Sequence, residues 1–278
     1  MTDPLANIRC FLLDMDGTFY LGENLLEGAL RFINVITAQG RDYVFLTNNS
    51  SKDRSQYVQK IRRLGLDIHA DKIFTSGEAT ALYLQERHPG ARLYVVGTPS
   101  LEEEFRLHGF SLADKDPDLV VLGFDTTLTY QKLWKLCDFV RAGFPYIATH
   151  PDFNCPTPTG FMPDTGAMIA FVKASTGREP DQVIGKPNRT IIDELSRKLR
   201  LPISQLAMIG DRLYTDIALG QTTGITTILV LSGETSLEDV QKSPFRPTCI
   251  FKHLGEVANH LAKLAFVRPG GDENEKAC

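Results

Sequence analysis

Short apolar runs of strand length alternate with longer amphipathic segments along most of the chain. Four apolar runs predict buried strands, at residues 8–14, 43–47, 206–210 and 226–231. The amphipathic segments predict helices, at residues 28–39, 52–64, 188–199, 213–222 and 254–266. Strands that alternate with helices are typical of α/β proteins with parallel sheets.

The middle of the chain repeats this alternation by itself. It predicts strands at residues 92–97, 119–124 and 146–149, and helices at 101–108, 130–141 and 165–175. Such a block can bury a small core of its own. We therefore expect a doubly wound, Rossmann-like α/β core made of residues 1–78 and 180–266, with a smaller α/β domain, residues 79–179, inserted into it. Residues 267–278 are polar, and we expect them to form a flexible tail.

Composition and charge narrow the possible partners. The chain has 278 residues, of which 42% are hydrophobic and 23% charged, as in ordinary globular proteins. Its formal net charge of -4 argues against nucleic acid or an anionic membrane as a partner, because both attract clustered Lys and Arg. Lys60, Arg62 and Arg63 do cluster, but we interpret them as the solvated face of a helix.

The cysteines and the apolar runs indicate in which cellular compartment the protein is expected. The five cysteines are scattered without a CxxC pair, which predicts neither a disulfide framework nor a zinc site. Free cysteines are typical of a reducing cytoplasm. No apolar run approaches about 18 residues, and the N-terminus lacks the apolar segment of a signal peptide. We therefore expect a cytoplasmic protein without a membrane partner.

Paired carboxylates follow the first predicted strand. Asp14 and Asp16 lie two residues apart, so in extended chain both side chains project to one side at the strand's carboxyl end. Open α/β sheets bind ligands at that edge. Gly17 permits a sharp turn and lets backbone N–H groups approach an anion. By itself, the segment could equally be an Asp-rich turn.

Two other segments carry groups suited to phosphate. Thr47 and Asn48 end a predicted strand, and their hydroxyl and amide can donate to phosphate oxygens, although a helix cap is the alternative. Lys186 precedes a helix and can hold a positive charge against phosphate, although it could also be a surface lysine. A nucleotide-binding loop is excluded, because it would need Gly at Pro180 and Ser or Thr at Pro187.

A further acidic group follows the third core strand. Mg²⁺ prefers carboxylates, a carbonyl and waters, so Asp14, Asp211 and the backbone carbonyl of Asp16 would suit it. Asp216 begins the next helix. It could bind a metal-bound water, hold Lys186, or simply stabilise the helix N-terminus.

Together these motifs resemble those of the haloacid dehalogenase superfamily of phosphatases. The matching segments are Asp14-x-Asp16-Gly17-Thr18, Thr47-Asn48, Lys186 and Gly210-Asp211-x-x-x-Thr215-Asp216. The resemblance covers about residues 8 to 266. Because Asn48 and Lys186 are 138 residues apart (186 minus 48), the inserted domain lies between the second and third motifs. This placement is similar to that in the NagD-like, or 4-nitrophenylphosphatase, subfamily, whose inserted domain is an α/β cap.

The resemblance implies an activity and a role for each group. It implies a Mg²⁺-dependent phosphatase of small soluble esters, such as sugar phosphates, nucleotides and nitrophenyl phosphate, which could form a homodimer. Asp14 would attack phosphorus to form an aspartyl-phosphate, and Asp16 would protonate the leaving alkoxide and later activate water. The phosphate oxygens would be held by Lys186, Thr47, Asn48 and the backbone amides of Met15 and Asp16. Gly17, Asn49 and Asp216 would support them.

The cap loop at residues 150–160 is expected to select the substrate. Its three prolines stiffen the backbone and reduce the entropy lost on binding. By the resemblance, the corresponding loop of related phosphatases faces the active site. The candidate residues are His150, Asp152, Phe153, Asn154, Cys155 and Pro156. The alternative is a connector on the outer side of the cap.

Other activities stay open at this level. A phosphotransferase or phosphomutase would use the same phosphoenzyme but pass its group to an acceptor other than water. A phosphoacceptor signalling domain shares strand-end aspartates and a lysine, but it would be much smaller and would have no use for a cap. A protein that binds a ligand without catalysis is disfavoured, because all the expected polar groups are present.

Overall fold

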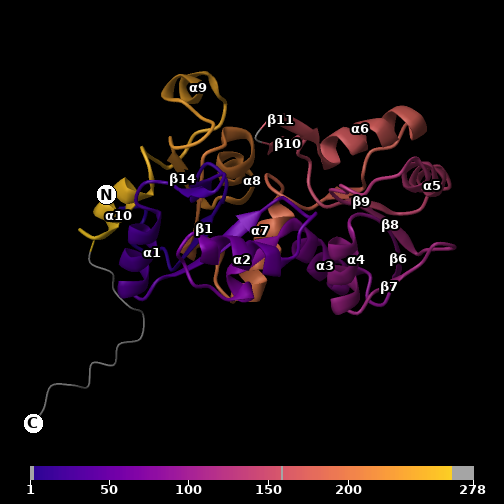
Figure 1. The fold of residues 1–278 in the computed structure, drawn as a ribbon, viewed down its shortest axis with the longest axis horizontal. Coiled ribbons are helices and arrows are strands. Elements are labelled where there is room, and N and C mark those ends of the chain that lie inside the picture. Colours follow the sequence, from indigo (N-terminus) through magenta and orange to yellow (C-terminus); the bar gives the residue numbers. More distant parts are fainter. Residues whose placement is uncertain (1–2, 158, 265–278) are drawn as a thin grey trace, which may run out of the picture.

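The structure, a computed structural model, describes residues 3–157 and 159–264. The chain forms two lobes (Figure 1). The larger lobe, the core, contains a six-stranded parallel sheet in the order β15-β14-β13-β1-β4-β5. Its strands are β1 (Cys10–Leu13), β4 (Asp42–Thr47), β5 (Ile73–Thr75), β13 (Leu206–Gly210), β14 (Thr226–Val230) and β15 (Cys249–Phe251). Both chain ends contribute to it, so the expected α/β parallel-sheet core is confirmed.

Helices cover both faces of this sheet because its strands are apolar on both sides. Phe11 and Leu13 pack with one hydrophobic cluster, whereas Cys10 and Leu12 pack with another on the opposite face. The first cluster includes α1 (Ala29–Ala38), α2 (Arg54–Arg63) and α10 (Leu254–Leu261), and the second includes α3 (Ser76–Arg87) and α7 (Arg189–Leu199). The remaining core helices are α8 (Ala218–Thr223), α9 (Leu237–Lys242), a π-helix at Leu213–Ile217 and short 3-10 turns at Ala70–Lys72 and Ile203–Gln205.

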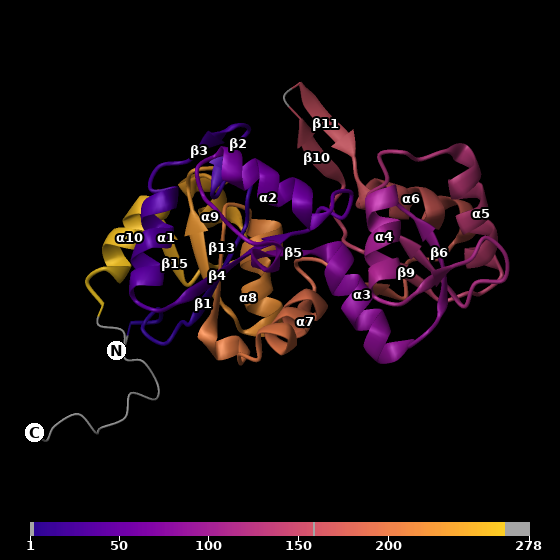
Figure 2. The same cartoon turned by 60° about the horizontal axis from the view of Figure 1, so that its bottom comes forward.

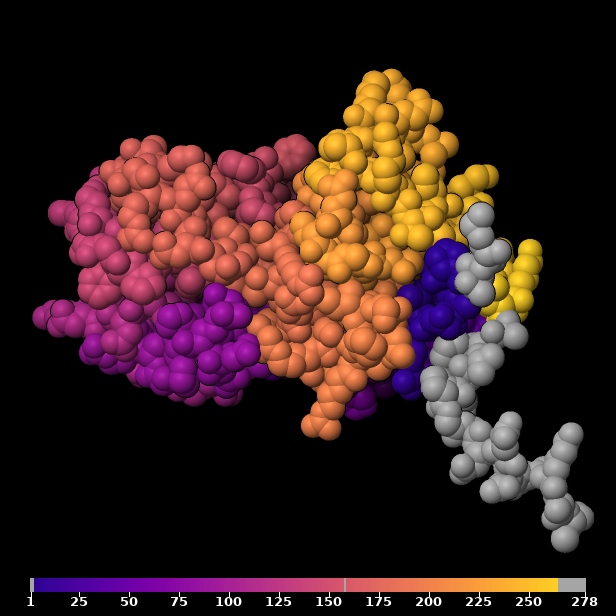
Figure 3. All heavy atoms as spheres, turned by 180° about the vertical axis from the view of Figure 1, so that it is seen from behind, coloured from indigo at the N-terminus to yellow at the C-terminus, as the bar shows by residue number. Residues whose placement is uncertain are grey.

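The middle of the chain forms the smaller lobe, the cap. Its sheet is also parallel, in the order β12-β9-β8-β6-β7. The strands are β6 (Arg92–Val96), β7 (Ser111–Leu112), β8 (Leu119–Leu122), β9 (Tyr146–Ala148) and β12 (Gln182–Val183). The helices are α4 (Pro99–Leu107), α5 (Tyr130–Arg141) and α6 (Thr165–Thr176). From the opposite side, the magenta and pink middle of the chain again forms a lobe apart from the indigo, orange and yellow ends (Figure 3).

The expected domain boundaries at residues 79 and 179 stay predictions, and both fall at the junction between the lobes. The first falls inside α3, which packs against α7 of the core and α4 of the cap, so this helix belongs to both lobes. The second falls before β12, where Gln182 pairs with Ile147 of the cap sheet. Strand β12 has only two residues, Gln182 and Val183, which are too few to show a strand pattern in the sequence.

The expected cap loop is in part a hairpin. Strand β10 (Asn154–Thr157) pairs antiparallel with β11 (Gly160–Pro163), and the hairpin projects from the cap on the side that faces the core (Figure 2). Pro156 pairs with Phe161 and is tolerated because each strand of a two-stranded ribbon has a free edge. A second hairpin, β2 (Tyr20–Leu21) and β3 (Asn24–Leu25), follows the first motif in the core.

Two further observations concern the end of the chain and membranes. The C-terminal helix ends at Leu261, earlier than expected, and the expected tail at residues 267–278 lies outside the described residues.

Within the described part of the chain, no helix is both long and apolar enough to cross a membrane.

The contact between α1 and α10 generates a stability prediction. Gly28 has φ +77°, and a Cβ there would lie 2.2 Å from Cα of Gly255. Gly28→Ala should lower the free energy of unfolding by about 2–4 kcal/mol, because backbone overlap adds to left-handed strain. Gly90→Ala, at φ +74° in open space, should cost only about 1 kcal/mol. Urea unfolding measures both, and equal losses would contradict the role of the overlap.

Candidate active site

The site lies where three neighbouring strands of the core sheet end. Strand β1 lies between β13 and β4 and runs parallel to both. Asp14 follows β1, Thr47 ends β4, and Asp211 follows β13. The shared strand direction therefore brings the first, second and fourth sequence motifs to one edge, as the sequence predicts. Lys186 reaches this edge from the segment that returns from the cap after β12.

Lys186 is the centre of the site. Its Nζ lies 2.6 Å from Oδ1 of Asp14, 2.7 Å from Oδ1 of Asp216 and 3.3 Å from the carbonyl of Leu46. The side chain is buried. Burial alone would lower the pKa of Lys186, but the carboxylates of Asp14 and Asp216 raise it above its ordinary value, so the lysine is a fixed positive charge.

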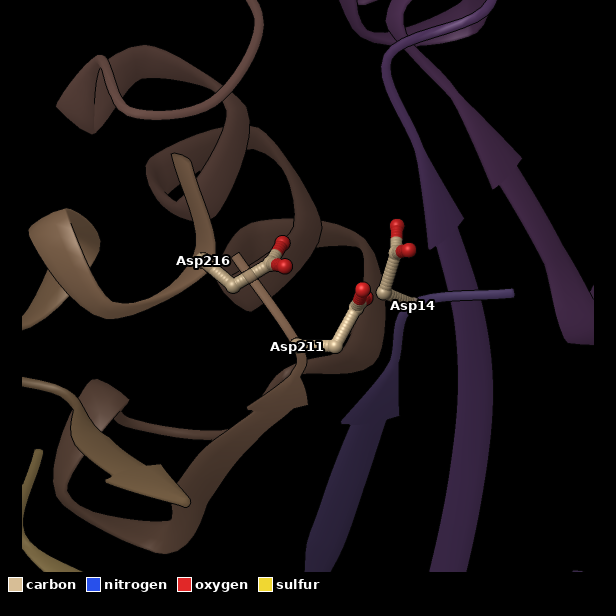
Figure 4. A group of neighbouring side chains, drawn as sticks. All are labelled: Asp14, Asp211 and Asp216. Carbon is tan, nitrogen blue, oxygen red and sulfur yellow. The ribbon is translucent and has the colours of Figure 1, made fainter. Parts of the chain in front are cut away.

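Three carboxylates converge beside this lysine. Oxygen atoms of Asp14, Asp211 and Asp216 all lie within 4.8 Å of one another, and the three side chains face a common space (Figure 4). Burial, followed by repulsion from the Asp14 carboxylate, raises the pKa of Asp211. Burial also raises the pKa of Asp216, against the opposing effect of Lys186. Clustered, buried carboxylates that repel one another fit a hard divalent cation, which would remove this repulsion.

The convergent carboxyl side chains are a different set from the expected metal ligands Asp14, Asp16 and Asp211, which stay a prediction. Asp216 joins the group of convergent carboxyl side chains, whereas the side chain of Asp16 is not among them. The expectation for Asp16 concerned its backbone carbonyl, so it stays a prediction. Asp216 uses Oδ1 for Lys186 and Oδ2 for the backbone N–H of Arg212. Holding Lys186 is therefore one of the three roles that the sequence left open for Asp216.

Asp211 is oriented by its neighbours. It accepts hydrogen bonds from the Thr18 hydroxyl at 3.2 Å and from the Glu234 backbone N–H at 2.8 Å. Gly17 has φ +83°, and a Cβ there would lie 2.3 Å from Oδ2 of Asp211. Gly17 is thus required both by its backbone conformation and by the position of Asp211.

Asp16 occupies a different environment from Asp14. Its carboxyl stays accessible to solvent, and it accepts a hydrogen bond from the backbone N–H of Gly22 in the turn between β2 and β3. Partial desolvation by the surrounding protein is the main cause of the raised pKa of Asp16. The Asp14 charge adds to this shift, while the Lys60 and Arg212 charges oppose it. A carboxyl with a raised pKa beside a nucleophile is suited to proton transfer.

The loop after β4 is held largely by its own side chains. Asn48 accepts from the backbone N–H of Lys186 at 2.7 Å and donates to the carbonyl of Lys186 and to Oδ1 of Asp152. Both amide protons of Asn48 are therefore engaged. Thr47 and Asn49 accept backbone N–H groups within the loop. The phosphate-binding roles of Thr47 and Asn48 stay predictions, and Asn48 would first have to release Asp152.

The first motif contains unused backbone donors. Among residues 3–157 and 159–264, no group accepts a hydrogen bond from the amides of Met15 and Asp16. These amides lie next to Asp14 and just before the turn at Gly17. Free backbone N–H groups at the end of a strand are suited to bind an anion.

The expectation that His150 contacts the substrate is wrong. His150 is fully buried at the lobe junction, with Nε2 2.8 Å from Oδ1 of Asp164 and Nδ1 2.9 Å from the Thr149 hydroxyl. It follows β9 by two residues and precedes the hairpin, which begins at Asn154. Its partners occupy both ring nitrogens, so it orders the junction.

The other cap residues lie farther along the chain. Phe153, Asn154 and Pro156 are exposed, and Cys155 is half-buried. Asp152 is engaged with Asn48. Their contacts with substrate stay predictions.

Sequence reasoning missed Arg212. Its Nε lies 3.1 Å from Oε2 of Glu234, and the Asp14, Asp211 and Asp216 charges help to raise its pKa, although burial opposes this. Its position immediately after Asp211 was the available signal.

Comparison with known proteins supports the geometry. Residues 11–111 match the haloacid dehalogenase-like hydrolase family, and residues 183–257 match a HAD-hydrolase-like family. An acid sugar phosphatase from Staphylococcus aureus is 38% identical over 93% of this chain and 100% of its own length. Among solved structures, 4-nitrophenylphosphatase from Thermotoga maritima has a TM-score of 0.90 and 47% identity, covering 93% of this chain and 99% of that one. NagD from E. coli K-12 has a TM-score of 0.84 and 34% identity, covering 90% and 98%.

These similarities extend over both lobes, so they include the placement of the cap between Asn48 and Lys186 as well as the four motifs of the core. The chain therefore belongs to the haloacid dehalogenase-like hydrolases and, within them, to the NagD-like phosphatases.

Proposed function

We propose that the protein hydrolyses phosphate monoesters of small soluble molecules through an aspartyl-phosphate at Asp14. The observation that carries this proposal is the buried Lys186 ammonium between Asp14 and Asp216, next to Asp211. This arrangement fixes a carboxylate nucleophile beside a permanent positive charge. Relatives named for acid sugar phosphatase and 4-nitrophenylphosphatase activities support the same substrate class.

In this mechanism the two aspartates of the first motif have different roles, one as nucleophile and the other as general acid and base. Asp14 attacks phosphorus, while Lys186 and the free amides of Met15 and Asp16 hold the phosphoryl oxygens. The solvent-accessible Asp16 protonates the leaving oxygen and later takes a proton from the water that hydrolyses the aspartyl-phosphate. Lys186 also orients Asp14 through the hydrogen bond from its Nζ.

Mg²⁺ is the proposed cofactor. Asp14, Asp211 and the Asp16 backbone carbonyl would hold it, with Asp216 close by. When bound, it would neutralise charge between the nucleophile and the phosphate. Haloacid dehalogenase-like phosphatases generally use this ion, which is consistent with an all-oxygen donor set.

The proposal also covers the acceptor of the phosphoryl group, the residues that meet the leaving group, and the cellular location and oligomeric state. Water is the proposed acceptor, and an alternative phosphotransferase would release less inorganic phosphate than alcohol product, which a mass-balance assay distinguishes. The exposed hairpin residues Phe153, Asn154 and Pro156 are proposed to meet the leaving group. We keep a cytoplasmic location and a possible homodimer as expectations from the sequence.

The first functional prediction concerns Asp14. Asp14→Asn should lower kcat for 4-nitrophenyl phosphate by about ten-thousandfold or more, because the neutral amide cannot attack phosphorus. Circular dichroism should show an intact fold, since Asp216 still pairs with Lys186. The matched control is Asp193→Asn, on the exposed side of α7, which should keep the parent rate. Appreciable phosphate release by clean Asp14→Asn protein would remove Asp14 as the nucleophile.

The second prediction concerns the metal. Exhaustive chelation should abolish phosphate release, and added Mg²⁺ should restore it. Asp211→Asn removes one charge from the three-carboxylate cluster, so this variant should need a higher Mg²⁺ concentration for half-maximal activity. A magnesium titration of parent and variant measures the shift. Full phosphatase activity after chelation would contradict the proposal that the enzyme needs Mg²⁺.

The third prediction separates the role of Asp16. Asp16→Asn should slow hydrolysis of an alkyl phosphate by about a hundredfold, because the leaving alkoxide needs a proton. The loss for 4-nitrophenyl phosphate should be smaller, since nitrophenolate leaves without one. The two kcat/KM ratios measure this difference. Equal losses for both esters would rule out Asp16 as the acid of the first step.

A further inference from the structure

The carboxyl end of the cap sheet is occupied by a loop of the core. Loop 48–51 follows β4 and contacts the edge at which the parallel strands β6, β8 and β9 end. Ser50 contacts residues that follow β8 and β9, and the hydroxyl of Thr98, after β6, donates to the carbonyl of Ser51 at 2.8 Å. Open α/β sheets ordinarily bind ligands at this edge. In the cap, the core loop takes that place.

The Ser50 hydroxyl joins this loop to two cap strands. It is buried, accepts the backbone N–H of Phe124 at 3.0 Å and lies 3.1 Å from the hydroxyl of Thr149. A Cβ at Gly123 would lie 3.0 Å from Oγ of Ser50 and 3.3 Å from Cγ2 of Thr149. Glycine at this position therefore leaves the space in which the two side chains meet.

The hydrogen bonds of His150 follow from counting donors. Its Nε2 lies 2.8 Å from Oδ1 of Asp164, and a carboxylate can only accept, so Nε2 carries a hydrogen. The hydrogen of the Ser76 hydroxyl goes to the carbonyl of Asn48. Nδ1 of His150 therefore accepts from the Thr149 hydroxyl, which lies 2.9 Å away.

The direction of the remaining bond is then fixed. Thr149 gives its hydrogen to His150, so its oxygen accepts from the Ser50 hydroxyl. A hydrogen on Nδ1 of His150 would instead leave one of these two buried hydroxyls without an acceptor among the described residues. We call this ordered series the junction chain, and its members are Phe124, Ser50, Thr149, His150 and Asp164.

Thr149 also contacts the segment that carries Lys186. Its carbonyl accepts the backbone N–H of Gly185 at 2.8 Å. A Cβ at Gly185 would lie 2.6 Å from both Oδ1 of Asn48 and Cβ of His150. The core loop, the end of the cap strand and the lysine segment therefore meet at one point.

Asn48 connects the position of the loop to that of Lys186. Its Oδ1 accepts the backbone N–H of Lys186 at 2.7 Å, and its Nδ2 donates to the backbone carbonyl of Lys186 at 2.9 Å. Satisfied networks of buried polar groups are rigid. The Lys186 ammonium lies 2.6 Å from Asp14, so a displacement of the loop would move the charge that faces the nucleophile.

We propose that Ser50 and Thr149 are positioning residues, which place the Lys186 ammonium for phosphate by holding loop 48–51 against the cap strands. The inference rests on the proposed function, because Lys186 is there taken to hold phosphoryl oxygens. Neither positioning residue touches the substrate. The cap thus sets the affinity for the phosphoryl group that all substrates share, in addition to contacting the leaving group.

Variants of Thr149 separate hydrogen bonding from packing. Thr149→Val nearly keeps the shape of the side chain but removes the hydroxyl, and so breaks the junction chain. We expect its affinity for inorganic phosphate, measured by calorimetry in buffer with magnesium, to fall about fivefold or more, because binding depends steeply on the placement of the binding group. KM for 4-nitrophenyl phosphate and for an alkyl phosphate should rise by the same factor. Thr149→Ser keeps the hydroxyl and should stay within about twofold of the parent.

Ser50→Ala is the second variant and should reproduce the loss of phosphate affinity. Because both residues belong to one chain, the double variant Ser50→Ala/Thr149→Val should lose little more than the more affected single variant. Thr227→Val is the matched control. It removes a buried hydroxyl that accepts the backbone N–H of Thr248 at 3.2 Å, but at the amino end of β14, away from the site edge. It should keep the parent affinity, and an equal loss in this control would overturn the positioning role.

The outcomes distinguish the two proposals. If Thr149→Val and Ser50→Ala bind phosphate like a parent that hydrolyses esters, the positioning role is overturned and the proposed function stands. A loss in Thr149→Ser as large as in Thr149→Val would assign the effect to packing and also overturn the role. If both hydroxyl-free variants lose affinity and Thr149→Ser does not, but the parent hydrolyses no ester, the proposed function fails and the positioning role stands.

Discussion

The site depends on one buried cation. Lys186 is nearly inaccessible to water, yet its ammonium contacts two carboxylates and a backbone carbonyl. Loss of one partner from such a buried group typically costs about 3–5 kcal/mol, so the positions of Asp14 and Asp216 are fixed by what Lys186 requires. Asp14 comes from the start of the chain and Asp216 from its last third. The ammonium thereby ties together the two segments that the inserted cap separates.

The same lysine connects the core to the cap through its backbone. Both backbone groups of Lys186 bond to the amide of Asn48, whose second amide proton goes to Asp152 of the cap. The Ser76 hydroxyl at the start of α3 donates to the carbonyl of Asn48 and lies near the buried His150–Asp164 pair. Polar groups buried at this junction must all find hydrogen-bond partners. The positions of the cap residues there, Asp152, His150 and Asp164, therefore depend on the position of Lys186. Asp152 shortly precedes the hairpin and contacts Asn48. A displacement of the hairpin would therefore change the contacts of Asn48 before those of Asp14.

Sequence reasoning was strongest where the function depends on strand order. Asp14, Asp211 and Lys186 follow apolar runs or precede a helix, and parallel pairing alone is enough to bring the strand ends together. It failed where burial comes from another part of the chain. His150 follows a strand and precedes three prolines, as a loop residue would, but α3 and the start of α6 cover it. Strands β12 and β7 have two residues each, too few to show a period.

Lys60 shows why charge pattern alone does not locate a site. Lys60, Arg62 and Arg63 look alike in sequence, but one turn of helix gives them different surroundings: Arg62 and Arg63 pair at the surface, whereas Lys60 lies on the Tyr20 ring. That ring is fixed by the hairpin that follows the first motif, so the position of Lys60 depends on the turn at Gly17. The conformation that places Asp14 against Lys186 therefore also places a cation beside Asp16. The turn after β1 in this way links the positions of Asp14, Asp16 and Lys60.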